Sequence, residues 1–264
     1  MKKKIRIGAL ISGGGTNLQA IMDACTSDRL PAEMAFVGSD RADAKGLKRA
    51  ENLGLHTFAV DYAGIIRRYN LNPRNETLPD DFNLSDTLAK QRLFDAGKEP
   101  EKIKRFLESR AVAEATLLKK MSLFHFDLLV LAGFMRTLTP YLIDRVNTDP
   151  ENPKIMNIHP ALLPAFPGVD GYGDTFRYGC KVGGCTVHFV NYGEDTGPII
   201  GQRAFQILPD DTLGSVKEKG LELEWRLYPE CIRLFAEGRL KVVRKSWIRG
   251  GHVVTRKIVE ILPF

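Results

Sequence analysis

The sequence predicts an α/β protein with a doubly wound, mostly parallel twisted sheet and helices on both of its faces. Short apolar runs alternate with segments of helical periodicity from residue 5 onward, an order that is typical of βαβ units. The run FDLLVLAG is almost continuously apolar, as in a strand that is covered on both faces. The glycine-rich SGGG separates the first apolar run from the first helical pattern. A ligand site is therefore expected at the carboxyl ends of the strands.

The first half of the chain supplies these elements in regular succession. Ile5–Ile11 is expected to form a buried strand. The apolar residues that follow the glycines fall at i, i+3, i+4 and i+7 on one helix face, namely Leu18, Ile21, Met22 and Cys25. Further strands are predicted at 34–38, 56–60 and 126–133, and further helices at 44–53 and about 101–122. This succession implies right-handed crossovers between parallel strands.

The second half has a different pattern. Strands are expected at 153–158, 183–190 and 200–208, followed by a helix from about 212 to 237. The tail alternates apolar and polar residues around Gly250 and Gly251, which predicts a C-terminal β-hairpin. We expect a single domain over residues 1–264, with one half at 1–150 and the other at 151–264.

Residues from about 62 to 108 interrupt the alternation of strands and helices. Stretches such as YNLNPRNETLPDDFNLSD are polar and rich in Pro and Asn, so we interpret this part as a surface insertion. A loop without chemistry is preferred over a functional lid. Replacement of residues 66–98 by a short Gly/Ser linker is then expected to leave the protein folded, because loop closure depends only weakly on length.

Composition excludes several classes of protein. The chain has 264 residues, 44% of them hydrophobic and 27% charged, and can bury a full core. No run reaches the roughly 18 apolar residues of a membrane span. The formal net charge of +6 is dispersed, and it fits a small phosphorylated or polycarboxylate substrate as well as nucleic acid. Neither nucleic acid nor a membrane is expected as a partner.

The cysteines are four, at irregular positions: Cys25, Cys180, Cys185 and Cys231. This spacing is not that of a disulfide framework, so a reducing compartment, the cytoplasm, is expected. Zinc binding by Cys180, Cys185 and His188 is disfavoured, because residues three apart on a strand face opposite sides. No metal site is predicted.

The stretch MNIHPALLPAFPG combines two polar residues with a proline-rich turn. Asn157 and His159 are two residues apart at the end of a predicted strand, so their side chains point to the same face. The prolines that follow restrict the backbone and build a rigid wall. The alternative is that His159 is an ordinary hydrogen-bonded structural histidine.

The stretch SGGGTNLQAI suits an anion. Glycines at a strand end allow close approach to the backbone, and the first turn of a helix presents free N–H groups. The stretch lacks the Gly-Lys-Ser/Thr of a P-loop, and Leu18 stands at the last glycine position of the dinucleotide fingerprint. A monophosphate is therefore favoured over ATP or NAD. A purely geometric glycine turn is the alternative.

The stretch VHFVNYGEDTGPII runs from a strand into a loop that carries Glu194 and Asp195. Such a loop can bring a carboxylate to an imidazole elsewhere in the fold.

Six motifs together resemble the phosphoribosylglycinamide formyltransferase family and its Rossmann-like fold. They are ISGGGTNLQAIMDAC, SDRADAKGLKRA, FDLLVLAGFMRTLTP, NIHPALLPAFPG, GCTVHFVNYGEDTGPIIGQ and EWRLYP, in the family's order from residue 5 to about 240. The resemblance implies transfer of a formyl group from the cosubstrate 10-formyltetrahydrofolate to glycinamide ribonucleotide in purine biosynthesis. A homodimer is the assembly that we consider.

The resemblance also implies roles for particular residues. The catalytic residues would be Asn157, His159 and Asp195. The addition of the amine to the formyl carbon needs a donor for the oxyanion and a route for the proton, and Asn157 could supply the donor. His159 as an imidazolium beside Asp195 could serve both needs without a covalent intermediate. The ribonucleotide would bind through its phosphate to Gly15, Thr16 and Asn17 of the first half, with Arg110 as a substrate-side arginine, and through its amine to Glu224 of the second half. The folate would bind through Met135, Arg136, Thr137 and Leu138, with Asn157, Glu194 and Asp195 closing over it.

The sequence departs from the family at four positions near the implied acceptor site. They are Asp170, Tyr172, Leu221 and Trp225. Related formyltransferases with another amine acceptor stay open for this reason, as does formyltetrahydrofolate deformylase. That enzyme is expected to need an N-terminal regulatory domain, and a methionyl-tRNA formyltransferase is expected to need a C-terminal tRNA-binding domain. A non-enzymatic binding module of the same fold is a further alternative, which the set of Asn157, His159 and Asp195 disfavours.

Overall fold

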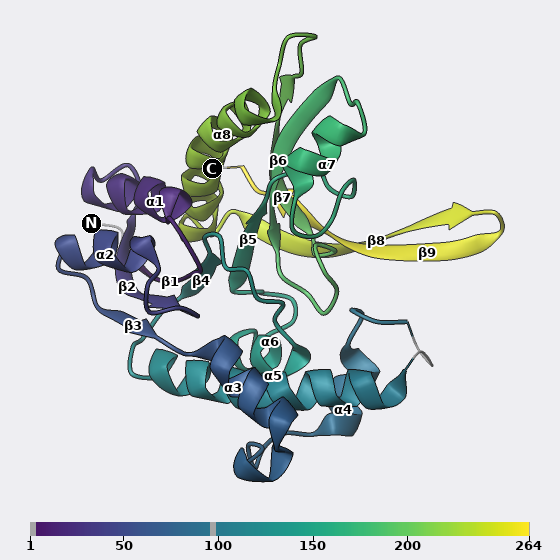
Figure 1. The fold of residues 1–264 in the computed structure, drawn as a ribbon. Coiled ribbons are helices and arrows are strands. Elements are labelled where there is room, and N and C mark those ends of the chain that lie inside the picture. The colour runs from purple at the N-terminus through teal and green to yellow at the C-terminus, as the bar shows by residue number, and fades with distance from the viewer. Residues whose placement is uncertain (1–3, 96–98, 264) are drawn as a thin grey trace.

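A seven-stranded sheet forms the centre of the molecule (Figure 1). The computed structural model describes residues 4–95 and 99–263. The strand order is β3-β2-β1-β4-β5-β6-β7. The pairs among the first five strands of this order are parallel, while β6 and β7 are antiparallel. The bounds are β1 Ile5–Ile11, β2 Ala32–Ser39, β3 Thr57–Ala59, β4 Leu128–Leu131, β5 Ile155–His159, β6 Val182–Phe189 and β7 Ile199–Gln206. The predicted doubly wound, mostly parallel sheet is confirmed.

Helices cover both faces of the sheet. One face packs against α1, α2 and α8, and the other against α3, α5 and α6. Within residues 4–95 and 99–263, no helix is long and apolar enough to cross a membrane. The bounds are α1 Thr16–Thr26, α2 Lys45–Asn52, α3 Tyr62–Leu71, a 3₁₀ turn Pro73–Asn75, α4 Leu84–Lys90, α5 Pro100–Met121, α6 Pro140–Val146, α7 Gly171–Arg177 and α8 Leu213–Ala236.

The strand order reverses between β1 and β4, and the loops that leave these two strands meet there. The backbone N–H of Ser12 donates to the carbonyl of Gly133 at 3.0 Å. The hydroxyl of Ser12 accepts from the N–H of Met135 at 2.8 Å. A crevice outside the carboxyl ends of parallel strands forms where the order reverses. These contacts therefore set the floor of the expected ligand site.

The interrupting segment is not the surface loop that we expected. Tyr62, Ile65 and Tyr69 lie on α3 and are buried in the core between the sheet and the helices α3, α5 and α6. Their spacing of i, i+3 and i+7 is helical, so the signal was present but hidden among Asn, Pro and Arg residues. Farther along, Asp81 accepts hydrogen bonds from Tyr141 at 3.0 Å and from Arg145. Much of the segment is thus tied to the domain.

The C-terminal hairpin is confirmed as β8 Leu240–Arg249 paired with β9 His252–Ile261. It forms a separate two-stranded sheet that projects from the body (Figure 1). At its base, Val242 is buried against the core shared with α8.

Candidate active site

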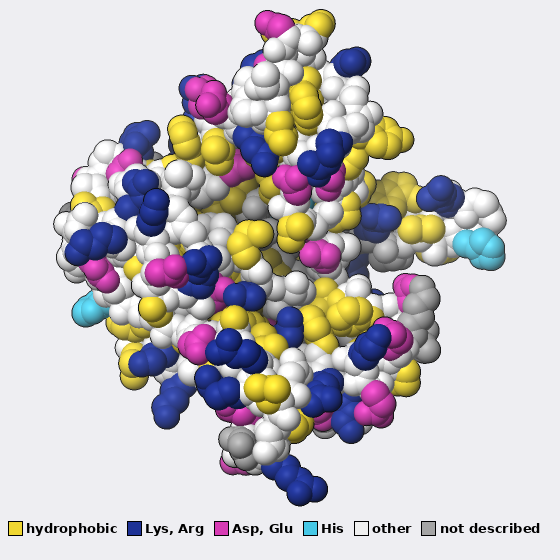
Figure 2. Space-filling view, viewed as in Figure 1, with side chains coloured by type: hydrophobic (Ala, Val, Ile, Leu, Met, Phe, Trp, Pro, Cys, Tyr) yellow, Lys and Arg dark blue, Asp and Glu magenta, His cyan; other side chains and the backbone are white. Residues whose placement is uncertain are grey.

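A cavity of about 400 Å³ opens at the point where the strand order reverses. Figure 2 shows the surface hollowed near the centre of the view. The loop after β4, the end of β5, the segment around residue 170, the loop after β6 and one face of α8 all contribute to its lining. This volume lies within the range of roughly 300–1,000 Å³ that is usual for small-molecule sites.

His159 lies at the end of β5 and is buried, with 3% of its surface exposed. Its Nδ1 is 3.1 Å from Oδ2 of Asp195, and its Nε2 is 2.8 Å from the carbonyl of Phe166. A carboxylate and a carbonyl can only accept, so both contacts are hydrogen bonds only when both ring nitrogens carry protons. Burial opposes the charged form, but the hydrogen bond and charge of Asp195 outweigh it, and the pKa of His159 is raised.

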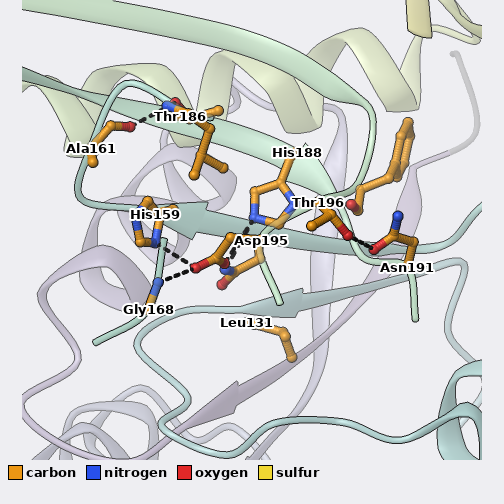
Figure 3. Close-up of polar contacts among 12 residues, drawn as sticks. Leu131, His159, Ala161, Gly168, Thr186, His188, Asn191, Asp195 and Thr196 are labelled. Atoms are coloured by element: carbon orange, nitrogen blue, oxygen red, sulfur yellow. Dashed lines mark hydrogen bonds and ion pairs between the residues drawn. The ribbon is translucent and has the colours of Figure 1, made fainter. Parts of the chain in front are cut away.

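Asp195 lies between two imidazoles (Figure 3). Its Oδ2 also accepts from the N–H of Gly168 at 2.9 Å, and its Oδ1 is 3.5 Å from Nε2 of His188. Burial alone would raise the pKa of this carboxyl, but the hydrogen bonds from His159 and Gly168 and the charge of His159 hold the pKa well below its usual range. Asp195 has a positive φ of 50°, a strained backbone that is typical of functional sites.

Asn157 shares its face of β5 with His159, as predicted, and both line the cavity. It pairs directly with His188 across the β5–β6 ladder. The Nδ2 of Asn157 is 3.3 Å from Nε2 of His188, whose Nδ1 is 2.9 Å from the carbonyl of Phe189. Because that carbonyl can only accept, Nδ1 of His188 carries the proton and Nε2 can accept from Asn157. The amide of Asn157 keeps a second N–H for a ligand.

Glu224 of α8 also lines the cavity and is buried. It accepts from Nδ2 of Asn17 and from the hydroxyl of Tyr172, each at 2.6 Å. Burial raises the pKa of Glu224, although these two donors oppose the shift. Oδ1 of Asn17 is buried without a hydrogen-bond partner among the described residues. The part of the cavity around Asn17 and Glu224 therefore offers acceptor oxygens to a ligand that carries N–H or O–H groups.

Gly15 caps the N-terminus of α1 in a left-handed conformation, with φ of 71°. A Cβ at this position would lie 2.8 Å from the Cα of Gly46. Both observations require glycine here. The first N–H groups of α1 remain free of intrahelical partners, as an anion site at a helix N-terminus requires.

Most of the predicted site residues line this one cavity. They are Asn17, Met135, Arg136, Thr137, Leu138, Asn157, His159, Glu194, Asp195 and Glu224. The departures at Asp170, Tyr172 and Leu221 line it as well. Arg136 is positioned by a contact of its Nε with Asp40 at 2.5 Å.

Three predicted residues lie elsewhere. Gly15 is outside the lining, and Thr16 lines a different cavity. Arg110 lies on α5, with its guanidinium carbon 3.9 Å from the centre of the Phe106 ring, and is also outside the lining. Its role as a substrate-side arginine stays a prediction.

His188 is the site residue that the sequence reasoning missed. From the sequence, His188 was considered only as a possible zinc ligand. In the structure it contacts both Asn157 and Asp195. Cys185 is buried in the core on the other side of β6. Among the described residues, no three His, Cys, Asp or Glu side chains are grouped as a metal site would require. Only the register of β5 against β6 could have revealed the role of His188.

The fold and cavity define a class of enzyme. The amide of Asn157, the imidazolium of His159 and the carboxylate of Asp195 line one cavity where the strand order of the doubly wound sheet reverses, and among the described residues of its lining there is no serine or cysteine. Such a set suits the direct transfer of a carbonyl group between two bound substrates.

Comparison with known proteins narrows this class. The formyl transferase family model matches residues 5–232. Phosphoribosylglycinamide formyltransferase of Haemophilus influenzae is 37% identical over 237 residues, 90% of each chain. The Bacillus subtilis enzyme of the same name is 32% identical and covers 86% of this chain and 93% of its own. The chain belongs to the formyl transferase family, as a relative of its phosphoribosylglycinamide formyltransferases.

Solved structures agree with this placement. Glycinamide ribonucleotide transformylase 1 from Symbiobacterium toebii superposes with a TM-score of 0.69 at 37% identity and covers 100% of this chain and 96% of its own. A formyltetrahydrofolate deformylase from Pseudomonas syringae has a TM-score of 0.65 at 19% identity, with 98% of this chain and 66% of its own covered. The deformylase shares the fold alone.

Proposed function

We propose that the protein transfers the formyl group of 10-formyltetrahydrofolate to the amino group of glycinamide ribonucleotide in purine biosynthesis. The observation that carries the proposal is the convergence of Asn157, His159 and Asp195 on a cavity that also holds Glu224. The two halves of the chain, 1–150 and 151–264, share this cavity as one domain. The four cysteines are free, which is consistent with the reducing cytoplasm as the place of action.

The acceptor would bind at the Glu224 end. Its phosphate would meet the N–H groups at the start of α1, where the helix dipole favours negative charge. Its amine and hydroxyl groups would donate to Glu224 and to the unpaired Oδ1 of Asn17. The amine must be neutral to attack, and a carboxylate next to it can orient it.

The folate would bind at the other end of the cavity, and it supplies the formyl group when bound. Leu131, Leu138 and Val190 line the cavity and would form the apolar side of this end. Backbone groups of residues 135–138, which also line the cavity, would pair with the edge of a polar ring system. A flat ring with hydrogen-bonding edges fits such a mixture of surfaces.

Asn157, His159 and Asp195 would act between the two ligands. The free N–H of Asn157 can donate to the oxygen on which negative charge develops. The positive charge of His159, held by Asp195, stabilises the same oxygen. Both N–H groups of His159 point at protein acceptors. A direct proton transfer from it therefore requires a substrate atom to replace Asp195 or Phe166 as the acceptor.

One assay separates this proposal from the deformylase alternative. The purified protein is incubated with 10-formyltetrahydrofolate, with and without glycinamide ribonucleotide, and both formylated ribonucleotide and formate are measured. Formylated ribonucleotide that appears only with the acceptor supports the proposal. Formate release without the acceptor would identify a deformylase, and folded protein without either product would favour a binding module.

Gly15→Val is expected to weaken binding of glycinamide ribonucleotide by at least about tenfold, because a branched Cβ would strain a left-handed residue at the phosphate cradle. Binding of the folate should change little, since only the phosphate of the acceptor is proposed to meet the start of α1. Calorimetry with each ligand tests this. Gly54→Val is the matched control, because Gly54 has φ of 70° and nothing within 4 Å of its Cβ position. Equal losses for both ligands, or for both variants, would favour a purely structural turn.

Tyr172→Phe is expected to raise the KM for the acceptor about tenfold with little change in kcat, because a charge-assisted hydrogen bond to Glu224 is lost. The pKa of Glu224 should rise further, so the effect should grow as the pH falls. Steady-state kinetics at several pH values measure both changes. Tyr178→Phe, an exposed position just after α7, is the control. An unchanged KM for Tyr172→Phe would show that its hydroxyl does not position Glu224.

The pH dependence of turnover should report on Asp195. His159 has a raised pKa, so its charge is complete at low pH and is lost as the pH rises through that value. We expect kcat to fall along this alkaline limb if the imidazolium is needed. Asp195→Asn removes the negative charge that favours the imidazolium, so the limb should move to lower pH. If the alkaline limb lies at the same pH in Asp195→Asn, it reports on a group other than His159.

A further inference from the structure

A second cavity, of about 600 Å³, lies between α1 and α8. We call it the α1–α8 groove. The polar side chains that line it from α1 include Thr16 and Gln19, and those from α8 are Trp225 and Arg226. Arg29, which follows α1, and Arg49 of α2 complete this charged part of the lining. Figure 2 shows Lys and Arg side chains on the surface over α1 and α2. Neither the proposed acceptor site nor the folate site uses these arginines.

The groove and the catalytic cavity share a wall. Asn17 and Glu224 line the catalytic cavity and are joined by their 2.6 Å hydrogen bond. Their sequence neighbours Thr16 and Trp225 line the groove instead. Successive residues of an α-helix point about 100° apart. Asn17 of α1 and Glu224 of α8 therefore face the catalytic cavity, while the residues next to them, Thr16 and Trp225, face the groove. A ligand in the groove would lie behind the Asn17–Glu224 contact.

The groove is positively charged. Arg49 donates from Nε to the carbonyl of Gly14 at 2.9 Å, and Arg29 donates from Nε to the hydroxyl of Ser27 at 2.8 Å. Neither these two arginines nor Arg226 has a carboxylate partner in the part of the chain that the structure describes. One carboxylate, Asp23, also lines the groove and accepts from Gln19 at 2.9 Å. Three guanidinium groups against one carboxylate favour an anionic ligand with more than one phosphate or carboxylate group.

Trp225 adds a flat surface to this charged lining. Its side chain is 40% exposed, so part of the indole is open to a ligand. One turn later Pro229 stands inside α8 and also lines the groove. Proline has no N–H to donate to the carbonyl four residues earlier, which leaves the Trp225 carbonyl without its helical partner. An aromatic ring that carries an amino group could stack on the indole and donate to this carbonyl.

We propose that the α1–α8 groove binds a nucleotide with two or more phosphates. The phosphates would be held by Arg29, Arg49 and Arg226, and the base would stack on Trp225. A volume of about 600 Å³ is within the usual range for a ligand of this size. Thr16 stands at the border between this site and the proposed phosphate cradle, whereas the three arginines and Trp225 line the groove and not the catalytic cavity. The proposal goes beyond formyl transfer.

Intrinsic fluorescence provides the test, because the chain has two tryptophans. The variant Trp247→Phe leaves Trp225 as the sole indole, and Trp247 lies on β8, outside the groove lining. ADP is titrated into this full-length protein, and inorganic pyrophosphate is titrated in parallel. We expect saturable quenching by ADP. We also expect ADP to bind at least about tenfold more tightly than pyrophosphate, since base stacking adds to phosphate recognition.

A second pair of variants tests the arginines. In the Trp247→Phe background, Arg226→Gln should weaken ADP binding about tenfold, because a charged donor to phosphate is lost. Arg233→Gln, two turns farther along α8 and outside the groove lining, should leave ADP binding unchanged. Formyl transfer at saturating substrates should be unchanged in both variants, which shows that they are folded.

Several results would overturn this proposal. They are the absence of quenching at millimolar ADP, equal affinities for ADP and pyrophosphate, or equal losses in Arg226→Gln and Arg233→Gln. Displacement of ADP by glycinamide ribonucleotide would also overturn it, because the groove would then belong to the acceptor site. Persistence of ADP binding in the presence of saturating glycinamide ribonucleotide supports a separate site.

Discussion

His159→Ala should lower kcat by about 10²- to 10⁴-fold, the usual contribution of a positioned acid–base group. The reason is that the imidazolium, held 3.1 Å from Asp195, supplies positive charge where the formyl oxygen becomes negative. Substrate binding should change much less, because an interaction made in the transition state lowers turnover without necessarily altering ground-state affinity. Single-turnover formyl transfer and calorimetry measure the two quantities.

Asp195→Asn should lower kcat to a comparable extent, since the nearly isosteric amide cannot balance the charge of His159. If the two residues act as one unit, the double variant should be only slightly slower than the slower single variant. His125→Ala is the control, because His125 lies near Asp127 in an exposed pair with Nε2 and Oδ1 3.7 Å apart. Near-normal turnover in His159→Ala would contradict the mechanism. Fully multiplicative losses would show that Asp195 works independently of His159.

Replacement of residues 66–98 by a short Gly/Ser linker should unfold the protein or lower its stability by several kcal/mol, on the order of the whole stability of a domain. The structure reverses the expectation from the sequence here. The excision removes Tyr69 and Thr87, which are buried, and it removes Asp81, the partner of Tyr141 and Arg145. Loop-closure entropy is small beside the loss of such contacts. Thermal and denaturant unfolding measure the change.

Two single substitutions on α3 separate packing from chain length. Tyr69 is 4% exposed and donates a hydrogen bond to Glu108 at 2.9 Å, whereas Leu71 is 79% exposed. Tyr69→Ala should therefore lower the free energy of unfolding by about 3 kcal/mol. Leu71→Ala should change it by less than about 0.5 kcal/mol. A stable excision variant, together with a harmless Tyr69→Ala, would restore the interpretation of this segment as a surface loop.

The strands and long helices were predictable because their signals are local. Short apolar runs mark β1 and β2, and the i, i+3, i+4 spacing marks α1. Helix α3 was missed because its buried face is formed by Tyr62, Ile65 and Tyr69, separated by charged and polar residues. Short helices such as α6 and α7, each of seven residues, owe their stability to packing rather than to a repeating pattern.

In the candidate site, too, relations between neighbouring residues were predictable, whereas contacts between distant positions were not. Asn157 and His159 could be paired from sequence because residues two apart on a strand share a face. The contact of Asp195 with His159 spans 36 positions, and that of Asn17 with Glu224 spans 207. The resemblance to a family suggested these residues, but no spacing rule could bring them together.

The sequence alone predicts the succession of sheet strands and long helices, the glycine turn before α1 and the shared face of Asn157 and His159. These features depend on neighbours within a few positions, where backbone geometry fixes the direction of each side chain. The sequence does not show that His188 contacts Asp195, that Tyr172 donates a hydrogen bond to Glu224 or that Thr16 and Trp225 line a second groove. Those relations depend on strand register and helix packing, which the burial of the whole core selects.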